Sequence, residues 1–102
     1  MATEVHFSSK AHKAKEKLSE DYQAVVDLLV QDLRETQGKP HGRGWDNCGP
    51  VKQLGDDMMH CHLSKRKPRI VVIWKVSHSK TENISSCICT IEYIGTHEKA
   101  PY

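Results

Sequence analysis

Two histidines stand two residues apart within residues 58–63, with a cysteine between them. Alternate side chains of an extended strand share a face, so His60 and His62 are predicted to lie beside Met58. The opposite face then carries the apolar side chains Met59, Cys61 and Leu63, which suit a core, so we expect the histidines to face outward. Two imidazoles at this spacing can bind a metal ion, can act as acid and base near neutral pH, or can simply stand on a solvated strand.

A cationic segment follows the histidines. Residues 58–81 contain six Lys or Arg and no Asp or Glu, although the net charge of the chain is only +2. Arg69 opens an apolar strand, where a guanidinium fork suits a phosphate group or is an ordinary strand-end charge. A basic turn precedes it, either solvated or attracted to phosphate. The residues predicted to bind an RNA backbone are His60, Lys65, Arg66, Lys67 and Lys75.

The last residues of the chain offer two more proton-transfer groups. His97 directly follows the last predicted strand, and Tyr102 carries a phenol that could donate a proton or stack on a base, unless this tail is frayed. Cleavage of RNA without a metal needs a base for the ribose 2′-OH, a cation for the phosphorane-like transition state and an acid for the leaving 5′-oxygen. The chain supplies these types in His62, Arg69 and His97, with Tyr102 as a further donor.

Length and composition exclude several classes of protein. The 102 residues fit one domain, and the longest purely apolar run, residues 70–74, is far below the roughly twenty residues of a membrane-spanning helix. The first ten residues hold no apolar stretch, so we expect no secretory signal, a cytoplasmic location and four reduced cysteines. We predict no cofactor and no metal, with a small zinc protein using His60, His62 and nearby cysteines as the alternative.

Apolar periodicity and turn residues predict the elements that must position these groups. We expect two helices, over residues 10–18 and from Ser19 until Gly38 and Pro40 end the second. A flexible loop is predicted over about residues 37–50, and a polar hairpin loop over residues 77–83. Strands are expected over residues 4–7, at an edge, and over 51–54, 58–63, 69–76 and 84–94. The order predicts a single α+β domain, residues 1–102, with two N-terminal helices packed on one face of a mainly antiparallel four- to five-stranded sheet.

The ordered set of motifs over residues 50–97 resembles the RelE/ParE toxin superfamily of bacterial toxin–antitoxin systems, most closely its YafQ-like and RelE-like mRNA-interferase branch. The residues that carry the resemblance are Pro50-Val51-Lys52-Gln53-Leu54-Gly55, His60-Cys61-His62-Leu63, Arg69-Ile70-Val71-Val72-Ile73-Trp74-Lys75-Val76 and Ile94-Gly95-Thr96-His97. The helical first half, opened by Val5-His6-Phe7-Ser8, is also typical of the family. The resemblance implies a microbial RNase-type fold and an endoribonuclease that cleaves mRNA in the ribosomal A site and so inhibits translation.

The resemblance also implies site residues and partners. His62 matches a family histidine in the strand before the central one, and His97 matches the YafQ-type histidine after the last strand. Arg69 stands where RelE-like toxins have their phosphate-stabilising arginine and YafQ-like toxins an aspartate, while Tyr102 lies near the C-terminal tyrosine of RelE-type and YoeB-type toxins. Gly49 replaces a YafQ-type histidine, so the site is a hybrid in which the base and the acid stay unassigned.

The partners implied are a cognate antitoxin protein and mRNA on the ribosome, with no membrane, and a toxin–antitoxin complex that binds operator DNA through the antitoxin. Two alternatives remain within the family. One is a ParE-like, non-catalytic inhibitor of DNA gyrase, against which the paired proton-transfer groups His62 and His97 argue. The other is a degenerate member that only binds an antitoxin.

Overall fold

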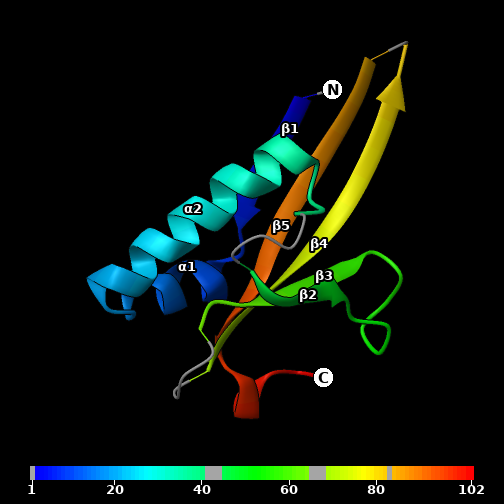
Figure 1. Cartoon of the computed structure of the whole chain (residues 1–102). Helices are drawn as coiled ribbons and strands as arrows, with labels where there is room; N and C mark the ends of the chain where they lie inside the picture. Colours follow the sequence, from blue (N-terminus) through cyan, green and yellow to red (C-terminus); the bar gives the residue numbers. More distant parts are fainter. Residues whose placement is uncertain (1, 41–44, 65–68, 83) are drawn as a thin grey trace.

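Figure 1 presents a computed structural model of the chain, which describes residues 2–40, 45–64, 69–82 and 84–102. Strand β1 (Ala2–Phe7) leads into two helices, α1 (Ser9–Glu16) and α2 (Glu20–Thr36). Four strands follow, which are β2 (Asp46–Pro50), β3 (Met58–His62), β4 (Ile70–Thr81) and β5 (Ile84–Thr96). A short 3₁₀ helix, η1 (His97–Lys99), precedes the last three residues.

Serine side chains cap the starts of both helices. Ser8 Oγ accepts a 3.1 Å hydrogen bond from the Ala11 backbone N, and Ser19 Oγ accepts one of 3.4 Å from that of Tyr22. These bonds satisfy backbone donors that have no partner within the first turn of a helix. Gln37 ends α2 in the left-handed conformation, with φ of 57°. No helix of the described residues is long and apolar enough to cross a membrane.

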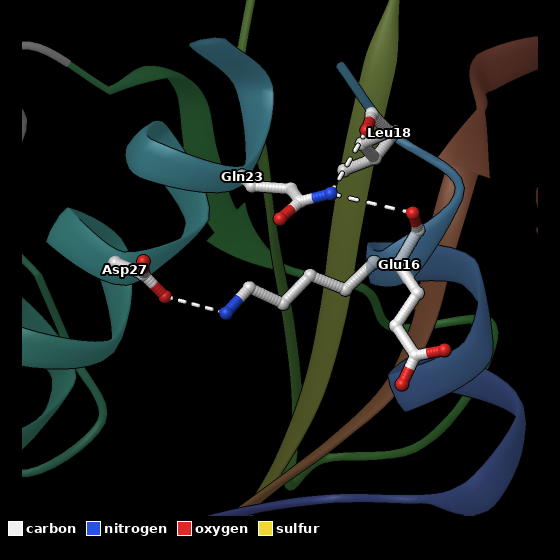
Figure 2. A network of polar contacts seen from close by, with 5 residues as sticks. Glu16, Leu18, Gln23 and Asp27 are labelled. Carbon is white, nitrogen blue, oxygen red and sulfur yellow. Dashed lines mark hydrogen bonds and ion pairs between the residues drawn. The ribbon is translucent and has the colours of Figure 1, made fainter. Parts of the chain in front are cut away.

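A small network of polar contacts fixes the corner between the two helices (Figure 2). Gln23 Nε2 donates to the backbone oxygens of Glu16 and Leu18, at 3.3 and 2.9 Å. Lys15 Nζ lies 2.6 Å from Asp27 Oδ1 and so joins α1 to α2. The two bonds to carbonyl groups satisfy the end of α1, so this corner needs no glycine.

The five strands form one mixed sheet in the order β1-β5-β4-β3-β2. The β5–β4, β4–β3 and β3–β2 pairs are antiparallel, whereas β1 lies parallel to β5 at one edge. The parallel pair is possible because both helices lie between β1 and the rest of the sheet along the chain, which allows a crossover connection. The α+β class and the edge position of the first strand are confirmed, and the sheet is mixed.

The helices cover one face of the sheet, where the larger core lies (Figure 1). Val26, Leu29 and Leu33 of α2 are fully buried there against the strands. The largest fully buried side chain is Trp74 of β4, whose Nε1 donates a 2.9 Å hydrogen bond to the Gly38 backbone oxygen just after α2. This bond ties the end of α2 to the central strand.

Three sequence predictions about loops are corrected. Asp46–Pro50 is strand β2 rather than part of a loop, and the short strand expected over residues 51–54 is a turn region. The expected hairpin loop over residues 77–83 is largely strand, since β4 continues to Thr81. The polar residues of these segments form strands because backbone hydrogen bonds to an antiparallel neighbour stabilise them. A strand whose two faces are solvated does not require apolar side chains. Residues 41–44, within the predicted flexible loop, lie outside the described residues.

Candidate functional site

Four aromatic side chains contact one another in a closed circuit on the sheet face opposite the helices. The ring centroids of His60 and His62 are 5.6 Å apart, and those of His62 and His97 are 5.3 Å apart. Tyr102 completes the circuit, at 5.9 Å from His97 and 5.4 Å from His60. All four pairs meet edge to face at separations typical of favourable aromatic contacts. We call these four residues the histidine cluster.

Strand register places the first two members of the histidine cluster. In the antiparallel ladder His62 lies opposite Val71, and His60 lies opposite Ile73. Residues opposite one another project from the same face, which is here the face away from α1 and α2. Cys61, between the two histidines, is buried in the helix-side core. The predicted alternation of residues 58–63 is therefore confirmed.

The C-terminal segment supplies the other two members. After β5 the chain enters η1, which carries His97, and then returns toward β3, where Tyr102 packs (Figure 1). Ala100 and Tyr102 pack against a second, smaller hydrophobic cluster formed by Val51, Met58 and Ile73. This return brings together side chains that are separated by more than thirty positions in the sequence.

The return of the chain also corrects one prediction. The histidines of β3 were expected to face outward, but His62 is only 6% exposed and His60 is half-buried. They do lie on the face away from the helices, yet the C-terminal segment covers that face. His97, in contrast, is exposed. His97 is therefore accessible to a substrate, whereas His62 lies buried behind it in ring contact.

A backbone contact orients the His60 ring. His60 Nδ1 lies 2.9 Å from the backbone oxygen of Gly49 in β2. Because a carbonyl oxygen only accepts hydrogen bonds, Nδ1 carries the hydrogen in this contact. The neutral ring then has its lone pair on Nε2, which is the form that accepts a proton. Gly49 thus contributes its backbone carbonyl group to the site.

Tyr102 differs from the other members in having a buried hydroxyl group. Its oxygen has no hydrogen-bond partner among the described residues. Burial, and to a smaller extent the nearby Tyr93, raises the pKa of the Tyr102 phenol above its ordinary value. The phenol is therefore held in its protonated form, which is the form that donates a hydrogen.

Arg69 lies next to the histidine cluster along the chain and across the sheet. The His97 backbone N donates a 2.9 Å hydrogen bond to the Arg69 backbone oxygen. Ile70 packs into the helix-side core, so by alternation Arg69 lies on the face of the histidine cluster. The residue is exposed, as a group that meets a phosphate must be. The backbone of Arg69 thus lies beside that of His97, whose ring contacts His62.

The predicted RNA-binding residues divide into two groups. Lys75 lies on β4 opposite Met58, and its Nζ is 3.7 Å from Asp57 Oδ2. Its side chain is 47% exposed, so it remains accessible from the face of the histidine cluster. Lys65, Arg66 and Lys67 lie outside the described residues, between β3 and β4 in the sequence.

Sequence reasoning missed Tyr93, which lies beneath the C-terminal segment. A register shift between Ile73 and Trp74 places Ile73 opposite Tyr93 and Trp74 opposite Ile91, so Glu92 is an extra residue in β5. The bulge moves Tyr93 to the face of the histidine cluster, where its hydroxyl group donates a 2.8 Å hydrogen bond to the Thr96 backbone oxygen. The sequence contains a signal for this bulge. The apolar core residues of the strand change from odd-numbered positions, which end at Ile91, to an even-numbered position, Ile94.

The side chains of the histidine cluster determine which chemistry it can carry out. Within residues 2–40, 45–64, 69–82 and 84–102, no group of three or more His, Cys, Asp or Glu is arranged to hold a metal ion. What the arrangement can do chemically is move protons, because it combines three imidazoles and a phenol. No model of a protein family, no curated protein and no solved structure matches this chain.

Proposed function

We propose that the chain is the toxin of a type II toxin–antitoxin system, with a RelE-like, microbial RNase-type fold, and that it cleaves mRNA in the ribosomal A site. The observation that carries the proposal is the histidine cluster, whose four rings meet at 5.3–5.9 Å. The backbone of Arg69 is joined to that of His97 by a 2.9 Å hydrogen bond. The family resemblance of residues 50–97 adds the substrate and the partners. These are mRNA on the ribosome and a cognate antitoxin, which also links the complex to operator DNA in the cytoplasm.

The proposed reaction is acid–base cleavage of the RNA backbone without a metal. A histidine takes the proton of a ribose 2′-OH, and the resulting oxygen attacks the adjacent phosphorus. The bond from phosphorus to the 5′-oxygen then breaks, and a second group protonates that leaving oxygen. Arg69 stabilises the charge of the phosphorane-like transition state.

Burial and exposure suggest how the roles divide. His97 is exposed and contacts His62, so these two rings share the roles of base and acid. Tyr102 either stacks on the substrate or gives a proton, since its phenol is buried against two of the histidines. His60 is a third candidate base, because its contact with the Gly49 carbonyl group leaves Nε2 free of the ring hydrogen.

The test is cleavage of a reporter mRNA in a translating extract. We expect His97→Gln and Arg69→Gln each to slow cleavage by about 10²–10⁴-fold, the usual contribution of such groups. His78→Gln is the matched control, because His78 is an exposed histidine on the distal part of β4. Cleavage should continue in EDTA once the ribosomes are supplied with excess magnesium, and a requirement for a transition metal would contradict the proposal.

Other outcomes would identify the alternatives. Equal cleavage by wild type, His97→Gln and Arg69→Gln would overturn the assignment of the site. Growth arrest with intact mRNA and induced DNA damage would favour a gyrase inhibitor. Stable binding to an antitoxin encoded by a neighbouring gene, without growth arrest, would indicate a degenerate toxin.

A further inference from the structure

A hollow lies on the sheet face of the histidine cluster, next to that cluster. Its volume is about 520 Å³, which is within the range of small-molecule sites. Met58, Ile73 and Tyr93 line it with apolar and aromatic surface. None of these residues has a role in the proposed cleavage.

The hollow and the histidine cluster share a wall. Pro101 lines the hollow, and the adjacent Tyr102 contacts both His60 and the hydrophobic cluster of Met58 and Ile73. Met58 and His60 lie on the same face of β3, and two such positions are about 7 Å apart. A chain molecule that lies on the histidine cluster therefore reaches the hollow with its next unit.

The rim of the hollow carries charges of both signs. Lys10, at the start of α1, and Lys75 of β4 supply two cations, and Asp57 and Glu92 supply two carboxylates. Asp57 lies 3.7 Å from Lys75, so that pair is already engaged. Glu92 is exposed and is the extra residue of the β5 bulge, a feature that redirects a side chain out of the regular alternation.

These groups match the parts of a nucleotide. A base has two flat faces, which stack on aromatic and apolar side chains such as Tyr93 and Met58. Its phosphate is attracted to lysine, here Lys10. Its edge can offer amino hydrogens, and a carboxylate such as that of Glu92 accepts from the amino group of cytosine. Uracil has an oxygen at that position, which a carboxylate repels.

We propose that this hollow binds the nucleobase next to the scissile phosphate and that Glu92 selects a base with an exocyclic amino group over uracil. The inference rests on the proposed function in taking RNA as the substrate. It adds a subsite and a specificity-determining residue to that function.

The test uses cytidine and uridine 5′-monophosphates, whose rings have the same shape and differ in the amino group. Binding is followed through the methyl signals of the methionines in NMR spectra. We expect cytidine monophosphate to move the Met58 signal, because Met58 lines the hollow, and to leave Met59 in place, because Met59 packs into the helix-side core. The affinity for cytidine monophosphate should exceed that for uridine monophosphate about tenfold.

Surface variants separate the two kinds of contact. Glu92→Gln should bring the two affinities within about twofold, since a neutral amide both accepts and donates. Lys10→Gln should weaken both nucleotides equally, and Lys17→Gln, an exposed lysine at the other end of α1, should change neither. Equal affinities in the wild type, shifts at Met59 rather than Met58, or an unchanged ratio in Glu92→Gln would overturn the proposal.

The outcome is independent of catalysis. Base-selective binding in a chain that does not cleave mRNA would retain the subsite and reject the enzyme. Normal cleavage without base-selective binding would reject the subsite alone.

Discussion

Two tyrosines near the histidine cluster differ in what their hydroxyl groups contact, and the difference predicts opposite effects of removing them. The Tyr93 hydroxyl donates a 2.8 Å hydrogen bond to the Thr96 backbone oxygen. The Tyr102 hydroxyl is buried and has no hydrogen-bond partner among the described residues. A typical internal hydrogen bond contributes about 1 kcal/mol to stability, whereas an unpaired buried hydroxyl costs about 1–3 kcal/mol.

The substitutions Tyr93→Phe and Tyr102→Phe remove one oxygen each and keep both rings. We expect Tyr93→Phe to lower the free energy of unfolding by about 1 kcal/mol and Tyr102→Phe to raise it by about 1 kcal/mol. The gap of about 2 kcal/mol corresponds to at least about 8 °C in Tm for a domain of this size. Urea denaturation followed by tryptophan fluorescence measures the first quantity, and calorimetry measures the second.

Cleavage of mRNA by the same pair distinguishes the two roles left open for Tyr102. If the phenol gives a proton to the leaving oxygen, Tyr102→Phe slows cleavage although it stabilises the fold. If the ring only stacks, Tyr102→Phe cleaves at the wild-type rate. A loss of stability in Tyr102→Phe as large as that in Tyr93→Phe would refute the reasoning, because it would mean that the hydroxyl group is hydrogen-bonded in solution.

Three further predictions concern pH, thiol reactivity and backbone space. The folded-state pKa of Tyr102 is raised above the unfolded value of about 10, so its contribution to stability is full below about pH 10 and is lost as pH rises through the folded pKa. Burial also raises the pKa of Tyr93, so ultraviolet titration at 295 nm should show a late phase that Tyr102→Phe reduces and that the double substitution with Tyr93→Phe removes. Burial raises the pKa of the Cys61 thiol strongly, and Cys61 is fully buried whereas Cys48 is half-buried. A thiol reagent should therefore label Cys48 before Cys61, and the reverse order in mass spectrometry would contradict this prediction. A Cβ at Gly95 would lie 2.7 Å from the Tyr93 hydroxyl oxygen, whereas a Cβ at Gly49 would have nothing within 4 Å. In urea denaturation, Gly95→Ala should therefore lower the free energy of unfolding by about 1–3 kcal/mol and Gly49→Ala by less than about 0.5 kcal/mol. Equal losses of stability in the two variants would contradict this prediction.

Local signals in the sequence were sufficient for several elements. A serine before each helical segment marks its start, because the serine side chain satisfies free backbone donors; Ser8 or Ser9 was expected at the first helix, and Ser8 is the cap. The alternation over residues 58–63 assigns Cys61 and the two histidines to their correct faces. These features depend only on residues that are neighbours in the chain, so a single sequence is sufficient to predict them.

Features that depend on distant contacts were not predicted. His62 is buried because the C-terminal segment returns over β3, and no local pattern encodes where a tail packs. β2 forms at Asp46–Pro50, among glycines and prolines, because β3 offers it an edge with which to pair. The bulge at Glu92 moved Tyr93 to the site, although the shift in apolar phase after Ile91 was a usable signal.

The histidine cluster is where the chemistry of the side chains departs from what packing alone requires. Val71 and Ile73 fill the same sheet face with apolar groups, and apolar residues could cover them from the C-terminal segment without burying any polar atom. Instead β3, η1 and the last residue each bring a titratable ring, and one hydroxyl group is buried with no partner in the part of the chain that the structure describes. A protein retains such a cost where function requires it, and a binding surface such as that of a gyrase inhibitor requires no proton-transfer groups. For this reason we propose a catalytic role for the histidine cluster rather than a purely structural or binding role.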